Sequence, residues 1–412
     1  MSAVTPLRPR LRVLDDLAIF GGTPLFDSPR PLGQLGTPDV EKFLGLLREA
    51  YERGQLTGNG AFVQQLEARL AAYHGVQHCI AVANAALGLT MLMQVLAQGR
   101  HGEVVMPAFT YPGLPHFSRF AGQTPRFCDV DEATHGLDPR AVQAALSGRT
   151  TAILAVNNSN QPPDIDGLTR VAKAAGVPLF FDSVDGVGTT YKGKKLGGFG
   201  RAEVFSLHAT KLLNGFEGGY ITTNDAALAA VLRWQREQAP AAMRPDGAEH
   251  VPGMNGTLNE IHAALALLSL DNVGQIVARN QARHDAYMAI TRAIGTLRLV
   301  PGRASATEQG NWRWAVCEIL EGWPLTREHT VALLRAEGAE IAPYYGLPLH
   351  RSAHCPPGYD VQSLPVTERL AKRFFHLPVG GLVSLADIER IGELLRFVAA
   401  HGPAIAARMA SP

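Results

Sequence analysis

The chain has 412 residues, of which 46% are apolar and 18% charged, a composition and length that suit one large globular domain plus a smaller one. Lys and Arg total 38 against 37 Asp and Glu, so the net charge of +1 gives no electrostatic basis for binding nucleic acid or an anionic membrane. With no bilayer-length apolar run and no CxxC pair among the four cysteines, we expect a soluble, cytoplasmic protein without a metal site or disulfide framework.

The N-terminal half begins with an irregular arm and then alternates short apolar runs with helical segments. Residues 1–35 are punctuated by Pro and Gly, which favours an arm. Helical spacing starts after Pro38 and stops at Gly54, and LTGNGAFVQQLEARLAAYHGV then predicts a loop and a second helix. The short apolar runs that follow are candidate strands: CIAVA (79–83), EVVMP (103–107), TPRFCDV (124–130), TAILAVN (151–157), VPLFFD (177–182), EVFSLH (203–208) and GGYITTN (218–224).

Apolar runs without strict alternation are typical of strands buried on both faces of a parallel sheet. Their alternation with helices predicts an α/β fold, with a large, mostly parallel, doubly wound domain over 36–260. EVFSLH and GGYITTN lie close together, so we expect them to depart from β-α alternation. A long helical stretch over 258–295 could bridge two lobes, and 261–412 would hold this stretch and a smaller C-terminal domain.

Polar residues that follow strands are candidate site residues, because ligands bind beyond the carboxyl ends of strands in open parallel sheets. Lys211 comes after EVFSLH and shortly before the pair Gly218 and Gly219. A lysine there could form a Schiff base with a carbonyl cofactor, or could simply lie on the surface. Asp182 ends VPLFFD, where a carboxylate could bind a cationic ring nitrogen or cap a turn or helix.

Other strand ends offer groups for an anion and a planar ring. Ala85 and Ala86 open a helix after CIAVA, where small residues let backbone N–H groups approach a phosphate. Ser206 and His208 could add side-chain donors to the same phosphate. Tyr111 follows EVVMP and could stack on a heterocycle, although such a ring is more often packed in a core.

Asn255 lies between glycines in GMNGTLNE, just before the long helical stretch. An asparagine at a lobe junction fits a contact with a ligand or a second subunit, and turn chemistry would explain it equally well. The first strand is followed by NAALGL rather than GxGxxG, which disfavours a nicotinamide-dependent dehydrogenase.

Together these segments resemble the DegT/DnrJ/EryC1/StrS family of pyridoxal-phosphate sugar aminotransferases, which have fold type I. SLHATK followed by NGFEGGYITTND is similar to the family's S-x-H-x-T-K…EGG segment. The likeness continues in order along nearly the whole chain, in MPAFTYPG, TPRFCDVDEATHGLDP, QPPDIDGL, FFDSVDGVG, GMNGTLNEIHAALALLSL and YYGLPLH. It implies a large domain that binds pyridoxal 5'-phosphate, a smaller C-terminal α+β domain and transaminase activity.

The resemblance also implies a role for each candidate residue. Lys211 would hold the cofactor as a Schiff base and later shuttle a proton, Asp182 would pair with the pyridine nitrogen, and Tyr111 would stack on the ring. The remaining cofactor contacts would come from Ala85, Ala86, Asp185, Ser206, His208 and, from the neighbouring subunit, Asn255. A contact from the neighbour would make the protein a homodimer with shared active sites.

Three positions depart from the family's pattern. Asp185 stands where His or Gln usually bonds the cofactor's 3'-oxygen, and a carboxylate beside a phenolate is repulsive unless it is protonated or turned away. Thr257 stands where a basic residue is usual, and Ala342 appears in place of an arginine. These losses put the donor-carboxylate and sugar-nucleotide contacts in doubt, rather than the cofactor.

The leading hypothesis is therefore a ping-pong aminotransferase. It would move an amino group from glutamate or glutamine to a keto-sugar nucleotide or an aminocyclitol-type ketone. Lys211 argues against the relatives that dehydrate sugars, which carry histidine at that position. Two alternatives stay open: the same cofactor acting on a non-nucleotide substrate in secondary metabolism, and a non-catalytic relative that only binds the cofactor.

Overall fold

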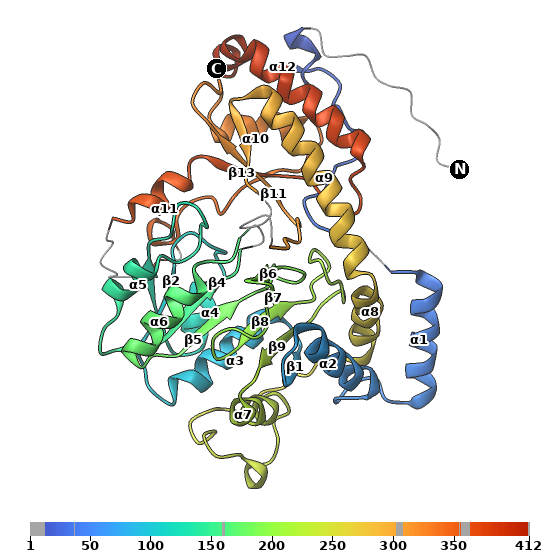
Figure 1. The fold of residues 1–412 in the computed structure, drawn as a ribbon. Coiled ribbons are helices and arrows are strands. Elements are labelled where there is room, and N and C mark those ends of the chain that lie inside the picture. Colours follow the sequence, from blue (N-terminus) through green and yellow to red (C-terminus); the bar gives the residue numbers. More distant parts are fainter. Residues whose placement is uncertain are drawn as a thin grey trace.

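The protein forms two units, each built on its own sheet, that lie one above the other (Figure 1). This computed structural model describes residues 13–36, 38–158, 161–301, 308–353, 355 and 363–410. Helix α9 (Val273–Ile294) runs from the larger unit along one side of the smaller one, which it joins through contacts with α12 (Leu385–Met409).

The larger sheet has seven strands in the order β1-β9-β8-β5-β4-β2-β3. Their bounds are β1 His78–Val82, β2 Glu103–Pro107, β3 Thr124–Cys128, β4 Thr150–Val156, β5 Leu179–Asp182, β8 Glu203–Ser206 and β9 Gly219–Thr223. The neighbouring strands β3, β2, β4, β5 and β8 pair in parallel, whereas β9 is antiparallel to both of its neighbours, β8 and β1. The mostly parallel α/β sheet is thus confirmed, and the expected departure from alternation falls at the β8–β9 pair.

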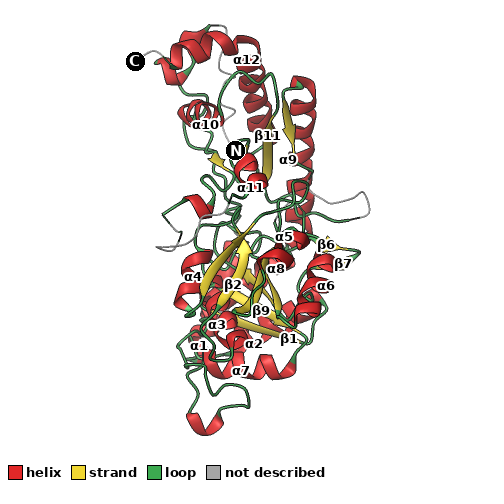
Figure 2. Cartoon of the chain, turned by 90° about the vertical axis from the view of Figure 1, so that its left-hand side faces the viewer, coloured by secondary structure: helices red, strands yellow, loops and turns green. Residues whose placement is uncertain are grey.

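Helices cover both faces of this sheet (Figure 2). In β1, Cys79 and Ala81 join the core on one face while Ile80 and Val82 join the core on the other. The first face is covered by α2 (Ala61–His74), α5 (Pro139–Ala145), α6 (Ile165–Ala175) and α8 (Glu260–Asp271), with α1 (Val40–Arg53) packed on the outer side of α8. The second face is covered by α3 (Ala85–Ala97), α4 (Leu114–Phe120) and α7 (Ala226–Arg236). Because both faces are buried, the strands show continuous apolar runs in the sequence.

The long helical stretch expected over 258–295 is in fact two helices. α8 ends at Asp271 and α9 begins at Val273, with a bend of 61° between them. The break is made by Asn272, whose N–H bonds the carbonyl of Ser269 in a tighter turn while φ stays at −102°. Gly274 lies just beyond the break, inside α9, and a single glycine within a helical pattern does not by itself predict a break. Among the described residues no single helix is long and apolar enough to cross a membrane; only α8 and α9 taken together as a bent pair meet that test.

The smaller unit has an antiparallel four-stranded sheet in the order β10-β11-β13-β12. These strands are β10 Leu297–Leu299, β11 Ala315–Ile319, β12 Ala342–Pro343 and β13 Phe374–Leu377. Their core is shared with α9, α10 (Arg327–Ala336) and α12. Outside both sheets lie the hairpin β6 Thr190–Tyr191 and β7 Lys194–Lys195, helix α11 (Pro365–Leu370), and the 3-10 turns η3 Ala241–Met243 and η4 Leu349–Arg351.

The described part of the arm packs on this smaller unit. It forms the turns η1 (Leu14–Asp16) and η2 (Ala18–Phe20), and Leu17 and Phe26 enter the unit's core. The carboxylate of Glu337 accepts the backbone N–H groups of Ala18 at 2.7 Å and Leu25 at 2.9 Å. The arm then leads toward the junction of the two units.

Candidate active site

A cavity of about 1080 Å³ lies between the two units, at the carboxyl ends of the parallel strands. Of the residues predicted for the site, it is lined by Ala85, Ala86, Tyr111, Asp182, Asp185, Ser206, His208 and Lys211. The smaller unit contributes Arg313, Trp314, Pro343, Tyr345 and His376, and the arm contributes Leu32 and Gly33. Residues far apart in the sequence therefore meet in one chamber, and Asn255 is the one predicted residue that does not line it.

Lys211 sits in the tight connection between β8 and β9. Its backbone N–H bonds the carbonyl of His208 at 2.8 Å, and the side chain brings Nζ to 3.0 Å from Oδ1 of Asp185. Burial lowers the pKa of Lys211, and the nearby carboxylate of Asp185 partly offsets this effect. A partly buried amine with a lowered pKa is suited to nucleophilic attack on a carbonyl group.

Asp182 is the last residue of β5 and its side chain is fully enclosed, with 2% of the residue exposed. Burial raises its pKa to about 7, while a hydrogen bond from the N–H of Val184 (3.1 Å) and the charge of Lys211 act in the opposite direction. The turn-capping alternative is thus partly true. Burial makes the ionised form of Asp182 unfavourable, so a cationic group inside the cavity would stabilise this carboxylate strongly.

The start of α3 forms another wall of the cavity. The side chain of Asn84 caps this helix by accepting the N–H of Leu87 at 2.8 Å, while Ala85 and Ala86 face the cavity with the first N–H groups of the helix. A Cβ at Gly219 would lie 2.5 Å from the backbone nitrogen of Ala85. The start of β9 can approach the helix this closely only because glycine stands there.

Polar and aromatic groups surround that helix start. The hydroxyl of Ser206 accepts the N–H of His208 at 3.2 Å, and the His208 ring bonds the hydroxyl of Thr210 at 2.8 Å. Tyr111 is 55% exposed at the cavity, with its ring 6.4 Å from that of Phe117. This tyrosine is therefore not packed in a core, which was the main alternative to its stacking on a ligand.

Asn255 lies on the surface, outside the cavity of its own chain. It pairs with Glu237 in an isolated antiparallel bridge, and its carboxamide oxygen accepts a bond from the Thr257 hydroxyl at 3.4 Å. An active-site role for Asn255 therefore requires a second copy of the chain and stays a prediction.

Sequence reasoning missed the partners of Asp185. Its Oδ1 lies 2.5 Å from a guanidinium nitrogen of Arg313 and 3.0 Å from Nζ of Lys211, and its Oδ2 accepts the indole N–H of Trp314 at 3.1 Å. The Arg313 and Lys211 charges hold the pKa of Asp185 below its usual range despite burial. The carboxylate is therefore ionised and anchored. A signal was present in NWRW (311–314), an arginine enclosed by tryptophans before a strand.

Ala342 itself does not line the cavity; it lies in β12 opposite His376. Its neighbour Pro343 does line it, and the guanidinium of the cavity comes instead from Arg313 on the way into β11.

The residues present fit pyridoxal phosphate. A buried carboxylate is available for the ring nitrogen, a partly buried amine for the aldehyde and a helix start for the phosphate. Four buried polar atoms of lining residues also have no hydrogen-bond partner within the described part of the chain: the Thr110 hydroxyl, the Asn157 carboxamide oxygen, Nε of Arg313 and Nε2 of His376. Such atoms require partners from a ligand or from water. Fold and cavity together define a pyridoxal-phosphate-dependent transaminase.

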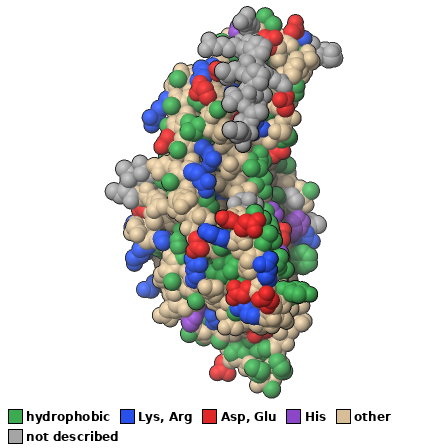
Figure 3. Space-filling view, turned by 90° about the vertical axis from the view of Figure 1, so that its right-hand side faces the viewer, with side chains coloured by type: hydrophobic (Ala, Val, Ile, Leu, Met, Phe, Trp, Pro, Cys, Tyr) green, Lys and Arg blue, Asp and Glu red, His purple; other side chains and the backbone are tan. Residues whose placement is uncertain are grey.

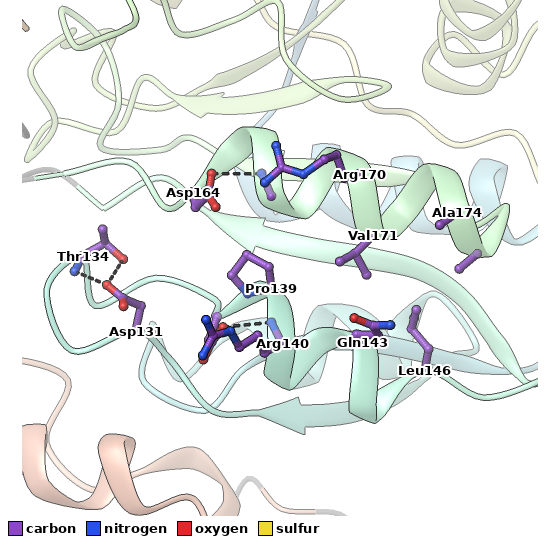
Figure 4. Close-up of a pocket in the computed structure, with 13 residues that line it drawn as sticks. Asp131, Thr134, Pro139, Arg140, Gln143, Leu146, Asp164, Arg170, Val171 and Ala174 are labelled. Atoms are coloured by element: carbon purple, nitrogen blue, oxygen red, sulfur yellow. Dashed lines mark hydrogen bonds between the residues drawn. The ribbon is translucent and has the colours of Figure 1, made fainter.

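A second large groove, of about 920 Å³, lies between α5 and α6 and contains none of the predicted residues (Figure 4). Its carboxylates serve local structure: Asp164 accepts the N–H of Gly167, and Asp131 accepts the N–H and hydroxyl of Thr134. Helix and loop capping therefore account for these carboxylates.

Comparison with known proteins agrees with this assignment. The model of the DegT/DnrJ/EryC1/StrS aminotransferase family matches residues 38–396, and the chain belongs to this family. GDP-perosamine synthase of Caulobacter vibrioides is 30% identical over 348 residues, which cover 83% of this chain and 91% of that protein. A pleiotropic regulatory protein of Geobacillus stearothermophilus is 30% identical over 323 residues, which cover 78% of this chain and 84% of that protein.

Solved structures give the same result. DesI, crystallised in the presence of its TDP-sugar product, has a TM-score of 0.89 and 34% identity, and the match covers 97% of this chain and 100% of DesI. 3-Amino-5-hydroxybenzoic acid synthase has a TM-score of 0.79 and 25% identity over 91% of this chain and 100% of its own. The fold is fold type I and the cofactor is pyridoxal phosphate.

Proposed function

We propose that this enzyme transfers an amino group from glutamate or glutamine to the keto group of a nucleotide-linked sugar. The observation that carries the proposal is the opening of the Lys211 amine and the buried Asp182 carboxylate into one large cavity. The similarity to DesI over 97% of the chain supports a nucleotide sugar as the acceptor, as does the similarity to GDP-perosamine synthase.

Each cavity residue has a task in this reaction. Pyridoxal phosphate, when bound, supplies a ring that takes up the carbanion charge of the donor carbon. Asp182 would bind the protonated ring nitrogen, and the Asp182 pKa would fall once a cation lies beside it. Lys211 would hold the cofactor through its ε-amino nitrogen and later carry the proton between the donor carbon and C4'.

The phosphate would lie at the start of α3. The N–H groups of Ala85 and Ala86 and the hydroxyl of Ser206 would bind it, with the helix dipole favouring its charge. Tyr111 would cover one face of the ring. His208 is exposed and already bonds Thr210, so we assign it a minor contact.

We infer that the active enzyme is a homodimer in which Asn255 reaches the phosphate of the other subunit. One face of α1 is apolar and open to solvent, with Val40 61%, Leu44 44% and Tyr51 76% exposed at helical spacing. Figure 3 views the side of the molecule that carries this helix, where hydrophobic side chains lie among charged ones. An apolar stripe of this kind favours burial against a second copy.

A non-nucleotide ketone is the second candidate for the acceptor. The lining includes Leu32, Leu89, Leu347, Leu349 and Phe117, while both of its long cations, Lys211 and Arg313, are engaged by Asp185. No lysine or arginine of the described cavity is therefore left over for a diphosphate. The similarity to 3-amino-5-hydroxybenzoic acid synthase, named for a product without a nucleotide, supports this candidate.

Two measurements test the proposal. The purified enzyme should be yellow and should lose the absorbance of its lysine-bound cofactor when glutamate or glutamine is added, whereas Lys211→Ala should not turn over. The aminated form should then be consumed by one member of a panel of keto-sugar nucleotides and aminocyclitol ketones. Consumption by the aminocyclitols alone would contradict the nucleotide assignment, and no response to any donor would contradict the whole proposal.

A further inference from the structure

We propose that Asp185 is a positioning residue for Lys211: its carboxylate holds the ε-ammonium group whenever the lysine is not bonded to the cofactor, and Arg313 and Trp314 anchor that carboxylate. The inference rests on the proposed function for the role of Lys211. It gives a purpose to the acidic residue that stands where a neutral one was expected.

Three donors fix the carboxylate of Asp185. Arg313 and Lys211 share Oδ1, at 2.5 and 3.0 Å, while the indole of Trp314 donates to Oδ2 at 3.1 Å. The backbone carbonyl of Asp185 also accepts the carboxamide of Asn311 at 2.5 Å. With both oxygens engaged, the side chain has one orientation, and it presents a negative charge to Nζ of Lys211.

Arg313 ties this carboxylate to the lysine's own backbone. Its other terminal nitrogen donates to the carbonyl of Thr210 at 2.8 Å, and Thr210 directly precedes Lys211. The guanidinium carbon lies 4.1 Å from the centre of the Trp314 ring, which in turn stacks on His376 at 4.4 Å. One buried cation thus holds both the carboxylate and the segment that carries the amine.

Charge balance explains why a carboxylate is needed. Arg313 is 1% exposed on its side chain, and a neutral residue at 185 would leave this guanidinium buried without an anion at hydrogen-bond distance. It would also leave two cations, Arg313 and Lys211, facing each other across the gap that Asp185 now fills. Asp185 therefore allows a buried arginine and an ammonium group to coexist.

The other titratable groups around the cluster change little between pH 8 and 10. Burial lowers the pKa of His376 to about 3 and raises the pKa values of Tyr344 and Tyr345, so all three are neutral there. Asp182, with a pKa raised to about 7, is ionised in that range. Removing the Asp185 charge should therefore lower the pKa of Lys211, because an anion nearby favours the charged form of the amine.

The test uses the cofactor-free protein, so its result does not depend on turnover. The rate of reductive methylation of Lys211 by formaldehyde and cyanoborohydride, read by peptide mass spectrometry, is followed against pH. Asp185→Asn should lower the midpoint by at least about one pH unit. Glu217→Gln is the matched control: it makes the same chemical change in the same cavity, but Glu217 faces His208 at 3.6 Å, and its midpoint should equal that of the wild type.

Trp314→Phe gives a second arm if Asp185→Asn fails to fold. It keeps the charges of Asp185 and Arg313 and an aromatic ring at position 314, but it removes the indole N–H that donates to the carboxylate. The midpoint should therefore fall by less than in Asp185→Asn. Midpoints within roughly 0.3 unit of wild type in the folded variants would overturn the inference. If the wild type still transaminates, that result would leave the proposed function intact. A wild type that takes up no cofactor would contradict the proposed function, and the methylation midpoints would still test the ion pair between Asp185 and Lys211.

Discussion

The two walls of the cavity differ in how they relate to the sequence. On the larger unit, Lys211, Asp182 and Ser206 each follow or end a strand, and all three were predicted. On the smaller unit, Arg313, Trp314 and His376 face the same cavity, and none was predicted. Strand ends of a parallel sheet converge by the rules of the fold, whereas the second wall exists only because two units pack together.

The comparison assigns different work to the two walls. The larger unit carries the groups that would touch the cofactor, and the smaller unit holds and neutralises the charges behind them. Changes on the first wall should therefore reduce catalysis, whereas changes on the second should mainly alter stability and the pKa of Lys211.

The largest effect is expected from Asp182→Asn on the predicted wall. The amide keeps the shape but cannot hold a proton on the ring nitrogen by charge, so kcat/KM should fall about 10²- to 10³-fold. Steady-state kinetics with the donor would measure the loss. Asp166→Asn, a carboxylate that pairs with Lys192 on the surface, is the control and should leave kcat/KM unchanged. Equal losses in both variants would remove the special role of Asp182.

On the wall that was missed, Arg313→Met should destabilise the fold. The substitution removes the guanidinium group that pairs with Asp185 and the hydrogen bond to the carbonyl of Thr210. Loss of one partner of a buried ion pair costs about 3 kcal/mol or more of unfolding free energy. Urea unfolding should show this, and the double variant Arg313→Met with Asp185→Asn should lose less than the sum of the single changes. The control Arg369→Met breaks an exposed pair with Glu132 and should cost below about 1 kcal/mol.

The two walls should also differ in their pH dependence. Burial raises the pKa of Asp182 in the folded protein to about 7 from its ordinary value of 3.8, so the folded state binds the extra proton and stability falls as pH rises from about 4 to 7. Asp185 has a lowered pKa, so its contribution is present above its unfolded pKa and is lost only in acid.

The measurement is the unfolding free energy of the cofactor-free protein at pH 5 and pH 8. Burial also raises the pKa of Glu203 to about 7, which lowers the unfolding free energy over the same pH range in every variant. The wild type is therefore compared with Asp182→Asn. The wild type should lose on the order of 2 kcal/mol more than that variant between the two pH values. Parallel profiles would show that Asp182 is not strained when the cofactor is absent.

Much of the large unit could be predicted because its signals are local. Each apolar run coincides with a strand to within two residues at either end, and the glycine at 219 is required by contact with Ala85. The 61° bend at Asn272 was not predicted, because the nearby Gly274 lies inside α9 and a lone glycine in a helical pattern is tolerated. Nor could the fate of Asp185: its charge state depends on Arg313, 128 residues away, and on the packing of the two units.

The smallest effect, and the finest test of the comparison, concerns one aromatic residue at the mouth of the predicted wall. Tyr111 is 55% exposed, so Tyr111→Ala should change the unfolding free energy little but should weaken cofactor binding about five-fold, the worth of one stacking contact. Tyr111→Phe keeps the ring and should bind as the wild type does. Phe120→Ala removes an aromatic ring that is 80% exposed outside the cavity and serves as the control. Fluorescence titration of the cofactor-free protein would separate the cases, and equal affinities in Tyr111→Ala and wild type would mean that this exposed ring does not stack on the cofactor.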